Sequence, residues 1–464
     1  MSRPGAGSLA DARPLPVWWE GRDTAPVSEP LTGERSADLV IVGAGLTGLW
    51  AAIHALEEEP GRDVVVLEAS HVGVGASGRN GGFLSESLTH GLAHGLATWP
   101  AELPELLRLG RANVAEIDAF VDREKIDADL RLCGKTAVAT RPHEVEALRA
   151  AHELNLQHGE ASTYLSAEQV RADVHSPSYL AGVRTAGGGL VDPWGLTTGL
   201  RDVAVRRGAT LHEESPVRSL ERDGDRVVVR TDRGVVRARQ VVLATNAFPP
   251  LLRRIRAYVL PVWDHVLATE PLSTGQLDAL GWADRQGLTD AGNQFHYYRR
   301  TADDRILWGG YDAVYYFGNG TQAAREQREA SHALLAEQFY ATFPQLAEVR
   351  MTHRWAGIID TTSRFTPVFG TAHAGRVAYA VGYTGLGVAS SRFGARVALD
   401  LLAGRETERT AVSLVSRRPV PFPPEPLRWT AVQATRAALA REDRTGRRGA
   451  LLRTMDRFGV GFNS

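Results

Sequence analysis

Short apolar runs alternate with helix-like stretches along most of this chain. Near the start of the ordered part, a β-rich run at 37–43 leads into helical spacing at 49–59 and then into an apolar run at 63–68. Apolar residues every three or four positions predict an amphipathic helix, and short β-branched runs predict strands. This segment therefore predicts a β-α-β unit.

The central part of the chain predicts more helices and then mostly strands. From about residue 91 the pattern is helical and charged, and two long β-like runs follow later, at 259–270 and 294–310. The second run folds about a turn signal at 301–304. The other expected elements are helices over 101–123, 142–154 and 194–207, and strands over 135–140, 209–212, 226–231, 235–238 and 240–244.

Both ends of the chain are expected to be weakly structured, over 1–35 and roughly 406–464. The proline-rich run at 419–426 is incompatible with a helix or a central strand. After it, residues 429–441 have a helical pattern, and we expect this helix to dock on the body of the protein.

Composition narrows the class of protein. The 464 residues are 43% hydrophobic and 23% charged, which is typical of a globular protein, and the formal net charge of −1 argues against nucleic acid as a partner. No run approaches the ~20 apolar residues of a membrane span, and no signal-peptide pattern occurs in the first 35 residues. Cys133 is the single cysteine, so neither an intramolecular disulfide nor a cysteine-rich metal site is expected. The lack of cysteine pairs fits a cytoplasmic location, which we expect.

The first chemical motif is the GxGxxG spacing of Gly43, Gly45 and Gly48, which directly follows a strand and opens a helix. The first glycine permits a tight turn, the second lets a pyrophosphate approach the backbone, and the third allows close packing of helix and strand. Glu68 ends the second strand 20 residues later, where its carboxylate can accept a hydrogen bond from a ribose hydroxyl. The sequence therefore predicts a dinucleotide site.

The glycine-rich loop at 73–82 favours FAD over NAD as the dinucleotide. A nicotinamide domain would normally continue into another helix, whereas this loop offers small residues and polar tips that can lie along a flavin. A flexible surface loop is the alternative interpretation.

Several further motifs resemble those of one family, the D-amino-acid-oxidase-like FAD-dependent oxidoreductases. The resemblance is to the branch of glycine and sarcosine oxidases, and most of all to gamma-glutamylputrescine oxidases, and it covers about residues 15–404. The motifs occur in order and at similar separations. They lie at 64–70, 75–82, 244–247, 297–305, 309–310, 343–346, 354–357 and 382–388.

The resemblance implies an α/β fold, α+β overall, in which a Rossmann-like FAD-binding domain is interleaved with a substrate domain built on a large, mostly antiparallel sheet. The expected FAD-binding pieces are 36–90, 185–250 and 351–404, and the expected substrate-domain pieces are 91–184 and 251–350. An N-terminal extension (1–35) and a C-terminal tail with a docking helix (405–464) complete the chain.

The resemblance also implies which residues contact FAD. The helix N-terminus after 382–388 would face flavin N1 and the C2 carbonyl, where its N–H groups stabilise negative charge. Relatives usually have histidine where Leu386 stands, so only a backbone role is expected there. The expected contacts are Gly43, Ala44, Gly45, Leu46, Thr47, Gly48, Glu68, Ala69, Gly75, Ala76, Ser77, Arg79, Asn80, Gly81, Gly82, Val217, Ala244, Thr245, Asn246, Gly357, Gly385, Leu386, Gly387 and Val388.

Attachment of FAD is expected to be non-covalent. Sarcosine oxidases tether the flavin through a late cysteine, and this chain has none after Cys133. The loop at 73–82 also has no histidine for the other common tether. No metal is expected.

The activity implied is oxidation of the C–N bond of an amine. Hydride leaves the carbon next to nitrogen for flavin N5, and the resulting imine hydrolyses to an aldehyde. Amino-acid oxidases of the family carry an Ala-Gly-x-Arg segment whose arginine grips the substrate carboxylate, but Ile359 stands at that position here. We therefore expect an amine whose charged group lies farther away, such as a γ-glutamylated amine, in polyamine or amine catabolism.

Aromatic and basic residues are the candidates for the catalytic and substrate-binding face, with core packing or a solvated strand face as the alternative for each. Arg299 is expected to meet an anionic tail, and the aromatic rings would enclose the amine. The candidates are Tyr298, Arg299, Trp308, Trp355, Tyr383 and His265, with Trp263 and His296 beside them.

The electron acceptor is expected to be O2, with H2O2 formed. Sarcosine oxidases activate O2 with a lysine, but the two lysines here, Lys125 and Lys135, fall in the segment expected to be helical and far in sequence from the pocket. Arginine, histidine or the reduced flavin itself would then suffice. The alternatives are an aminophosphonate or secondary-amine tailoring oxidase, and a flavin-bearing dehydrogenase subunit that passes electrons to a partner. The oligomeric state is left open.

Overall fold

The apolar runs at 37–43 and 63–68 are central strands of an eight-stranded sheet in the computed structural model, which describes residues 9–461. In it, β1 (Gly33–Val42) pairs in parallel with β2 (Val64–Leu67) on one side and with β11 (Gly234–Leu243) on the other. Buried parallel strands need apolar residues on both faces, which explains the unbroken valine and isoleucine runs. The remaining strands are β8 (Thr210–His212), β9 (Ser219–Asp223), β10 (Arg226–Arg230), β18 (Val368–Ala372) and β19 (Val377–Val381).

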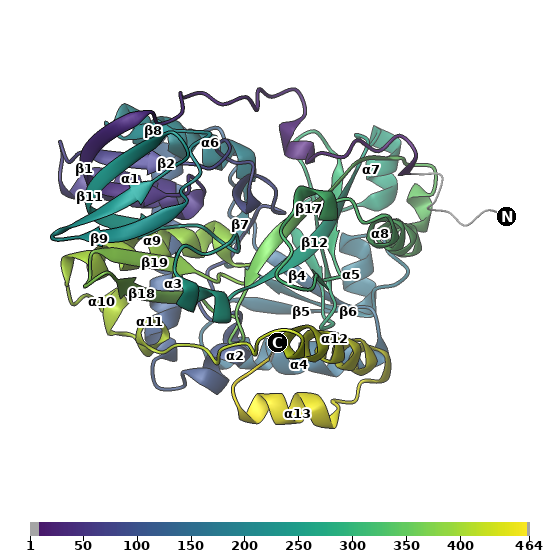
Figure 1. The fold of residues 1–464 in the computed structure, drawn as a ribbon. Coiled ribbons are helices and arrows are strands. Elements are labelled where there is room, and N and C mark those ends of the chain that lie inside the picture. Colours follow the sequence, from purple (N-terminus) through teal and green to yellow (C-terminus); the bar gives the residue numbers. More distant parts are fainter. Residues whose placement is uncertain (1–8, 462–464) are drawn as a thin grey trace.

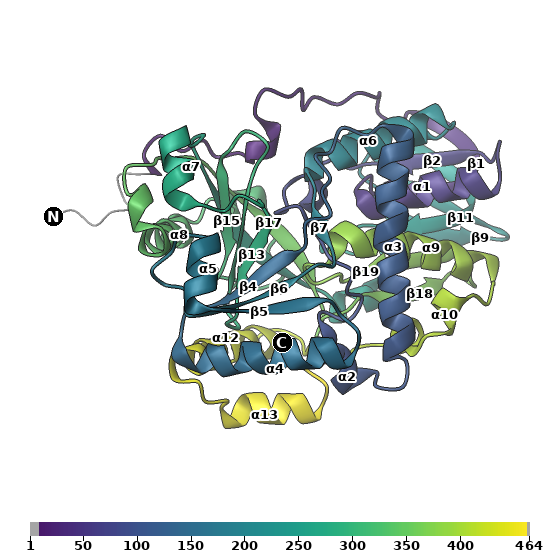
Figure 2. The same cartoon turned by 180° about the vertical axis from the view of Figure 1, so that it is seen from behind.

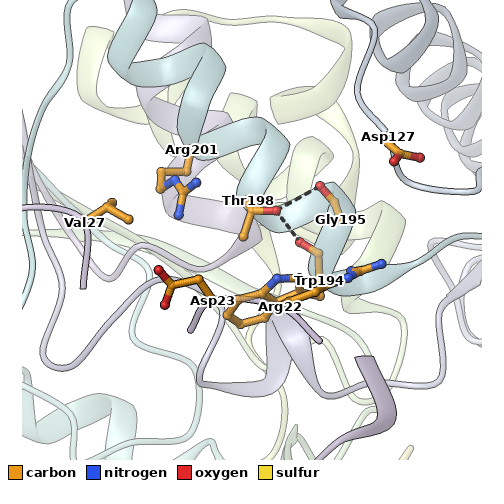
Figure 3. A pocket seen from close by; sticks show the side chains of 8 residues that line it. All are labelled: Arg22, Asp23, Val27, Asp127, Trp194, Gly195, Thr198 and Arg201. Atoms are coloured by element: carbon orange, nitrogen blue, oxygen red, sulfur yellow. Dashed lines mark hydrogen bonds between the residues drawn. The ribbon is translucent and has the colours of Figure 1, made fainter. Parts of the chain in front are cut away.

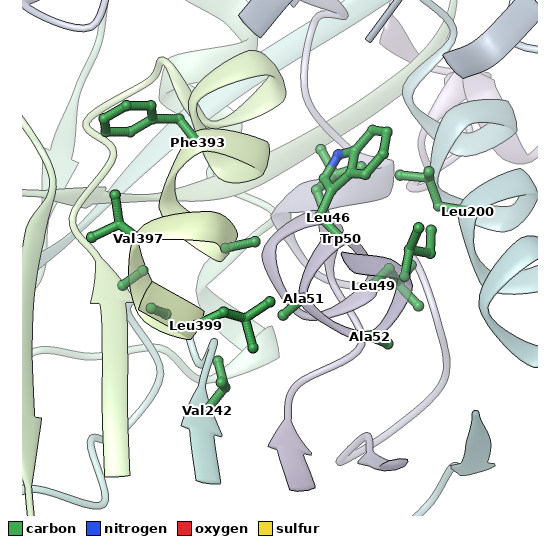
Figure 4. Packing of buried hydrophobic residues seen from close by; sticks show 14 of the residues in the cluster. Leu46, Leu49, Trp50, Ala51, Ala52, Leu200, Val242, Phe393, Val397 and Leu399 are labelled. Atoms are coloured by element: carbon green, nitrogen blue, oxygen red, sulfur yellow. The ribbon is translucent and has the colours of Figure 1, made fainter. Parts of the chain in front are cut away.

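Three helices, α1 (Leu46–Glu58), α6 (Pro193–Arg206) and α9 (Gly387–Ala403), contribute to the hydrophobic core on one face of this sheet (Figures 1 and 4). Trp50 of α1 has no exposed surface and meets Phe120 of α3 (Leu103–Glu124) edge to face, with 4.8 Å between ring centroids. Helix α3 therefore packs on this lobe, although it was predicted in the substrate domain. The physical reason is its long apolar face, which is buried in the same hydrophobic core as α1 and α9.

The second sheet has nine strands. Eight of them follow the order β16-β12-β15-β14-β13-β4-β6-β5, and the ninth, β17, also pairs with β12. Only β4 and β13 run parallel to each other; the other pairs are antiparallel. The strands are β4 (Lys135–Ala139), β5 (Ser162–Ser166), β6 (Ala181–Thr185), β12 (Leu260–Thr269), β13 (Gly287–Asp290), β14 (His296–Arg300), β15 (Ile306–Gly310), β16 (Val314–Tyr315) and β17 (Met351–Thr361).

One face of the second sheet packs on α5 (Ala167–Asp173), α7 (Thr274–Leu280) and α8 (Glu329–Thr342), which lie on the outer side in Figures 1 and 2. Near β4 and β6, the opposite face packs on α4 (Pro142–Gln157). The rest of that face is turned toward the first lobe. The shorter elements are β3 (Phe83–Leu84) paired with β7 (Gly189–Leu190), and α2 (Leu92–Thr98).

The N-terminal segment is ordered from Leu9, so the prediction of a weakly structured start is wrong for 9–35. It runs over the gap between the lobes (Figures 1 and 2). Arg13 pairs through its backbone with Thr352 and Arg354 of β17, at 2.8 and 2.9 Å. At the other end, the N–H of Val27 donates to Glu213 at 2.6 Å. Hydrogen bonds of the backbone, to strand β17 at one end and to the Glu213 carboxylate at the other, hold a segment whose composition alone predicts a loop.

The C-terminal tail is also ordered, as α10 (Glu408–Ala411), α11 (Ser413–Ser416), α12 (Leu427–Thr445) and α13 (Ala450–Arg457). Helix α12 lies beside α4 and docks as predicted: the buried Asp443 accepts the N–H groups of Asn293 and Gln294 at 2.8 and 2.9 Å. The prediction of weak structure is therefore also wrong for 406–461, and residues 462–464 lie outside the described residues.

The predicted fold class is confirmed, with a parallel-centred α/β lobe and a mostly antiparallel second sheet. Two details differ. The strands expected at 235–238 and 240–244 are the single strand β11, because β1 pairs with it along its length. Strand β17 belongs to the second sheet although it was placed in the FAD-binding domain. Across residues 9–461, no helix is long and apolar enough to span a membrane.

Candidate active site

The turn between β1 and α1 leaves no room for side chains. Gly43 has a φ of 102°, and a Cβ on it would lie 2.5 Å from the carbonyl oxygen of Ala244. A Cβ on Gly48 would lie 1.9 Å from the carbonyl oxygen of Gly43. The first glycine thus permits the turn, and the third brings α1 against it, as the GxGxxG spacing predicts.

Glu68 lies next to this turn. Its carboxylate accepts the N–H of Ala44 at 2.8 Å and that of Ser70 at 3.1 Å. Burial raises the pKa of Glu68, while these two N–H groups act in the opposite direction. The carboxylate therefore stands at the end of β2 facing the helix N-terminus, and its contact with a ribose stays a prediction.

The glycine-rich loop folds over the turn instead of lying free on the surface. Ser77 Oγ accepts the N–H of Leu46 at 2.9 Å, and the Asn80 amide donates to the carbonyls of Ala76 and Ser77. The indole N–H of Trp18 donates to the carbonyl of Asn80 at 2.9 Å. These bonds fix the loop between α1 and the N-terminal segment.

Arg79 joins this loop to the second lobe. Its guanidinium donates to Glu326 at 2.6 Å and to the carbonyl of Ala356 at 3.3 Å, and it lies over the ring of Trp19. The indole N–H of Trp355 donates to the carbonyl of Arg79 at 2.8 Å. Trp355 has no exposed surface, so the structure places it as a support for the loop.

The loop before α9 is held by Asp360, a residue that the sequence analysis did not single out. Its carboxylate accepts the N–H groups of Gly382 and Tyr383, at 2.5 and 3.1 Å. Burial raises the pKa of Asp360 to about 6, against the effect of these bonds. The sequence signal that could have found Asp360 is a carboxylate directly after Ile359, near the end of a strand.

These parts enclose one cavity of ≈ 500 Å³. It extends from the β1–α1 turn, past the glycine-rich loop, to the N-terminus of α9. The expected cofactor contacts that line it are Gly43, Gly45, Leu46, Thr47, Glu68, Ala69, Gly75, Ala76, Ser77, Asn80, Val217, Ala244, Thr245, Asn246, Gly385, Gly387 and Val388.

The other expected contacts do not line this cavity. Gly48 packs on the turn, Gly81 lies against the ring of Tyr297, and the Gly82 carbonyl accepts the N–H of Val191. Leu386 is the N-cap residue of α9 and provides no capping side chain. The remaining members are Ala44, Arg79 and Gly357.

The cavity fits FAD on three observations. It is lined by residues at two helix N-termini, and neither N-cap residue, Gly45 or Leu386, provides a capping side chain. Such ends bind phosphate and other anionic oxygens. The wall of the cavity at the β1–α1 turn is made of backbone, which suits a pyrophosphate. Glu68 lies where a ribose is expected.

The sheet over the cavity has two different faces, and β-strand alternation decides which side chains reach the site. Tyr298 and Trp308 pair across the strands and pack on Phe339 and Phe343, in and just after α8. The ring of His265 lies 5.2 Å from that of His332 in α8. Tyr298, Trp308 and His265 therefore point away from the site, and the expectation that they line it is wrong.

Two further candidates are occupied by structural contacts. Arg299 is on the correct face but has no exposed surface: it donates to the carbonyl of Val191 at 2.7 Å and lies 3.5 Å from Asp129. It is therefore not placed to meet an anionic tail. Tyr383 lines the cavity, but its hydroxyl accepts from Thr47 at 3.0 Å and joins α1 to α9.

The site-facing side of the sheet carries Asp264 and Tyr297, which the sequence analysis missed. Asp264 pairs with Gly357, and the Tyr297 hydroxyl donates to Asp264 at 2.5 Å. Burial raises the pKa of Asp264 to about 6, and the bond from Tyr297 acts against this rise. Each of them is the strand neighbour of a residue that was chosen, so the error is one of register.

A second hollow of ≈ 410 Å³ lies between the N-terminal segment and α6 (Figure 3). Two of its four charged residues form ion pairs, Arg22 with Asp192 and Arg201 with Asp202. None of the expected site residues lines it. Within 9–461, no cluster of histidine, cysteine or acidic side chains could hold a metal ion.

The family model described as "FAD dependent oxidoreductase" matches residues 38–401. The chain is 31% identical over 405 residues to gamma-glutamylputrescine oxidoreductase of Escherichia coli (strain K12), covering 85% of this chain and 90% of the relative. It is 28% identical over 396 residues to the probable oxidoreductase OrdL of Haemophilus influenzae, covering 82% and 86%.

A solved structure with a similar fold is glycine oxidase from Geobacillus kaustophilus. Its TM-score is 0.70 at 20% identity, covering 83% of this chain and 99% of that one.

Replacing Gly48 by alanine tests the close packing of the turn. Because the new Cβ would meet a backbone oxygen that cannot move aside, we expect the free energy of unfolding to fall by about 3 kcal/mol. FAD affinity should fall about tenfold or more. Thermal unfolding and titration of the apoprotein with FAD measure both, and Gly275→Ala in α7, where a Cβ meets nothing within 4 Å, is the control. Wild-type values for Gly48→Ala would contradict the packing.

Replacing Asp360 by alanine tests the loop before α9. The N–H groups of Gly382 and Tyr383 would lose their acceptor, at a cost of about 1–3 kcal/mol for each buried group. We expect the FAD dissociation constant to rise about tenfold or more in a fluorescence titration. Thr361→Ala, which removes only a hydroxyl bonded to its own strand at 3.5 Å, is the matched control. A lower melting temperature with unchanged FAD affinity would exclude a role for this loop in binding.

Proposed function

Because this chain belongs to the family of FAD-dependent oxidoreductases, we propose that it oxidises a C–N bond of an amine, with O2 as acceptor, and that it holds FAD non-covalently. The observation that carries the proposal is the polar pair Asp264–Tyr297 on the sheet face beside the cavity. Bound FAD would accept the hydride, and imine hydrolysis would give an aldehyde. The residues of the chain then need only bind, orient and deprotonate the amine.

Asp264 is the group suited to the amine nitrogen. An amine gives up hydride readily only when its nitrogen is neutral, whereas free aliphatic amines are protonated at neutral pH. Above about pH 6 the ionised Asp264 attracts the ammonium group and accepts its proton, and Tyr297 orients the carboxylate. Gly357, the strand partner of Asp264, has no side chain of its own, and the side chain of Arg79 lies against it, with 3.9 Å between the Arg79 Cβ and the place of a Cβ on Gly357.

The substrate class follows from the apolar wall at Ile359. This side chain lines the cavity where amino-acid oxidases of the family carry an arginine. A carboxylate next to the reacting amine would have no bidentate partner there. Together with the 31% identity to gamma-glutamylputrescine oxidoreductase, this favours an amine whose acidic group is remote from the nitrogen.

The second candidate is a flavin-bearing dehydrogenase subunit that delivers electrons to a protein partner. The supporting observation is apolar exposure at the start of α12, where Leu427 and Trp429 are 64% and 42% exposed. Relatives include both kinds of enzyme by name, such as dimethylglycine dehydrogenase of Homo sapiens at 24% identity. Rapid reoxidation by O2 of a reduced, isolated protein would eliminate this candidate.

A spectroscopic experiment tests the proposed activity directly. The purified protein should be yellow and should release its flavin on acid denaturation. Under anaerobic conditions γ-glutamylputrescine should bleach the flavin absorbance, and air should restore it. Glycine and D-alanine should bleach it at least about tenfold more slowly, since they need the missing arginine. Equal bleaching by glycine would overturn the inference from Ile359, and a protein that takes up no FAD would overturn the proposal.

The role of Asp264 predicts a specific pH dependence. Because its pKa in the folded protein is about 6, kcat/KM should fall as pH decreases through 6 and the carboxylate gains a proton. Asp264→Asn should lower kcat/KM by about 10²-fold and remove that limb of the profile. Tyr297→Phe should move the limb to higher pH, because the lost hydroxyl lowers the pKa of Asp264 in the wild type. An unchanged limb in Asp264→Asn would exclude Asp264 as the titrating group.

A further inference from the structure

The N-terminal segment, residues 9–32, lies outside the part of the chain that matches the family model, which begins at residue 38. It crosses the gap between the two lobes (Figures 1 and 2). Its contacts nevertheless reach both ends of the glycine-rich loop at 73–82, and most residues of that loop line the cavity.

The contact at the start of the loop is made through the buried residue Glu213. Its carboxylate accepts the N–H of Val27 from the N-terminal segment at 2.6 Å, and the N–H of Val72 at 2.8 Å. The residues on either side of Val72, His71 and Gly73, line the cavity. One carboxylate therefore connects the N-terminal segment to the cavity wall.

The contact near the end of the loop is made by Trp18, which is also buried. Its indole N–H donates to the carbonyl of Asn80 at 2.9 Å. The amide of Asn80 donates to the carbonyl of Ser77 at 2.9 Å, and Ser77 Oγ accepts the N–H of Leu46 at 2.9 Å. A series of hydrogen bonds thus runs from the N-terminal segment to the first residue of α1, where the pyrophosphate is expected.

Trp19 packs between these two contacts. Its ring centroid lies 5.6 Å from that of Trp194, and the guanidinium of Arg79 lies 4.8 Å from its ring. The ring of Trp194 packs against the loop so closely that a Cβ on Gly73 or on Gly78 would lie 2.8 or 2.9 Å from it. Two indole rings therefore support the loop, and one of them belongs to the N-terminal segment.

The stretch after Trp19 makes mostly polar contacts. No residue between 20 and 30 is buried, and Arg22, Asp23 and Val27 line the hollow of ≈ 410 Å³ beside α6 (Figure 3). A stretch with so little buried apolar surface opens easily by itself. Its docked position therefore depends on the contacts around the loop.

We propose that the N-terminal segment holds the glycine-rich loop in the conformation that binds FAD, with Trp18 and Trp19 as positioning residues. Binding of FAD then stabilises the docked segment in return, because the coupling of two binding events is reciprocal. This role concerns retention of the cofactor and is independent of the amine that is oxidised.

The first test compares Trp18→Phe with wild type, because this change keeps an aromatic ring and removes the indole N–H. We expect the dissociation constant of FAD to rise about three- to tenfold, the effect of one lost hydrogen bond. Fluorescence titration of the apoprotein with FAD measures it, and thermal unfolding of the apoprotein measures its stability. Trp429→Phe, at a position in α12 that is 42% exposed, is the matched control.

The second test measures hydrogen–deuterium exchange of the wild-type protein with and without FAD. Backbone N–H groups of residues 13–31 should exchange about tenfold or more slowly when FAD is bound, since the coupling acts in both directions. Residues 429–441 of α12 should exchange equally in both states. In Trp18→Phe, the protection that FAD gives to residues 13–31 should fall by the same factor as the FAD affinity.

Unchanged FAD affinity in Trp18→Phe would overturn the proposal, with or without a lower melting temperature, because the indole would then serve stability alone. An equal loss of affinity in Trp429→Phe would also overturn it. If Trp18→Phe does not fold, hydrogen exchange of the wild type decides: protection of residues 13–31 by FAD supports the coupling, and equal exchange in both states excludes it. A wild-type protein that takes up no FAD excludes it as well.

Discussion

The close approach of backbone to backbone at the β1–α1 turn is the constraint on which the rest of the site depends. Gly48 brings α1 against the carbonyl of Gly43, and Gly43 fits beneath Ala244 of the loop after β11. With α1 so placed, Ser77 reaches the N–H of Leu46 and Tyr383 reaches Thr47. One turn therefore fixes the glycine-rich loop and the start of α9 together, and the cavity between them follows.

Contacts between the lobes are concentrated around the same loop. Arg79 is held by Glu326 and the Ala356 carbonyl from the second lobe, and by the ring of Trp19 from the N-terminal segment. A guanidinium that is desolvated this far needs several partners, because an unpaired buried charge is costly. Hydrogen bonds of Arg79 therefore connect the glycine-rich loop of the first lobe to the second lobe, close to the place proposed for the chemistry.

The two faces of the nine-stranded sheet carry different kinds of side chain. Tyr298, Trp308 and His265 build an aromatic core with α8, and burial lowers the pKa of His265 to about 3, so its ring is neutral at ordinary pH. The neighbouring positions, Tyr297 and Asp264, stay polar and face the cavity side. A single residue of register separates a core ring from a side chain on the cavity side.

The sequence by itself determined the local features: the turn at Gly43, the strand that ends at Glu68, the uncapped start of α9 and the fold class. Each depends on neighbours within one unit of chain, where spacing and residue type fix the geometry. Only the tertiary structure decided which strand face meets the cavity and that Arg299 is enclosed. Those outcomes depend on which helices cover the sheet, and alternation alone leaves both faces possible for strands that are apolar on each side.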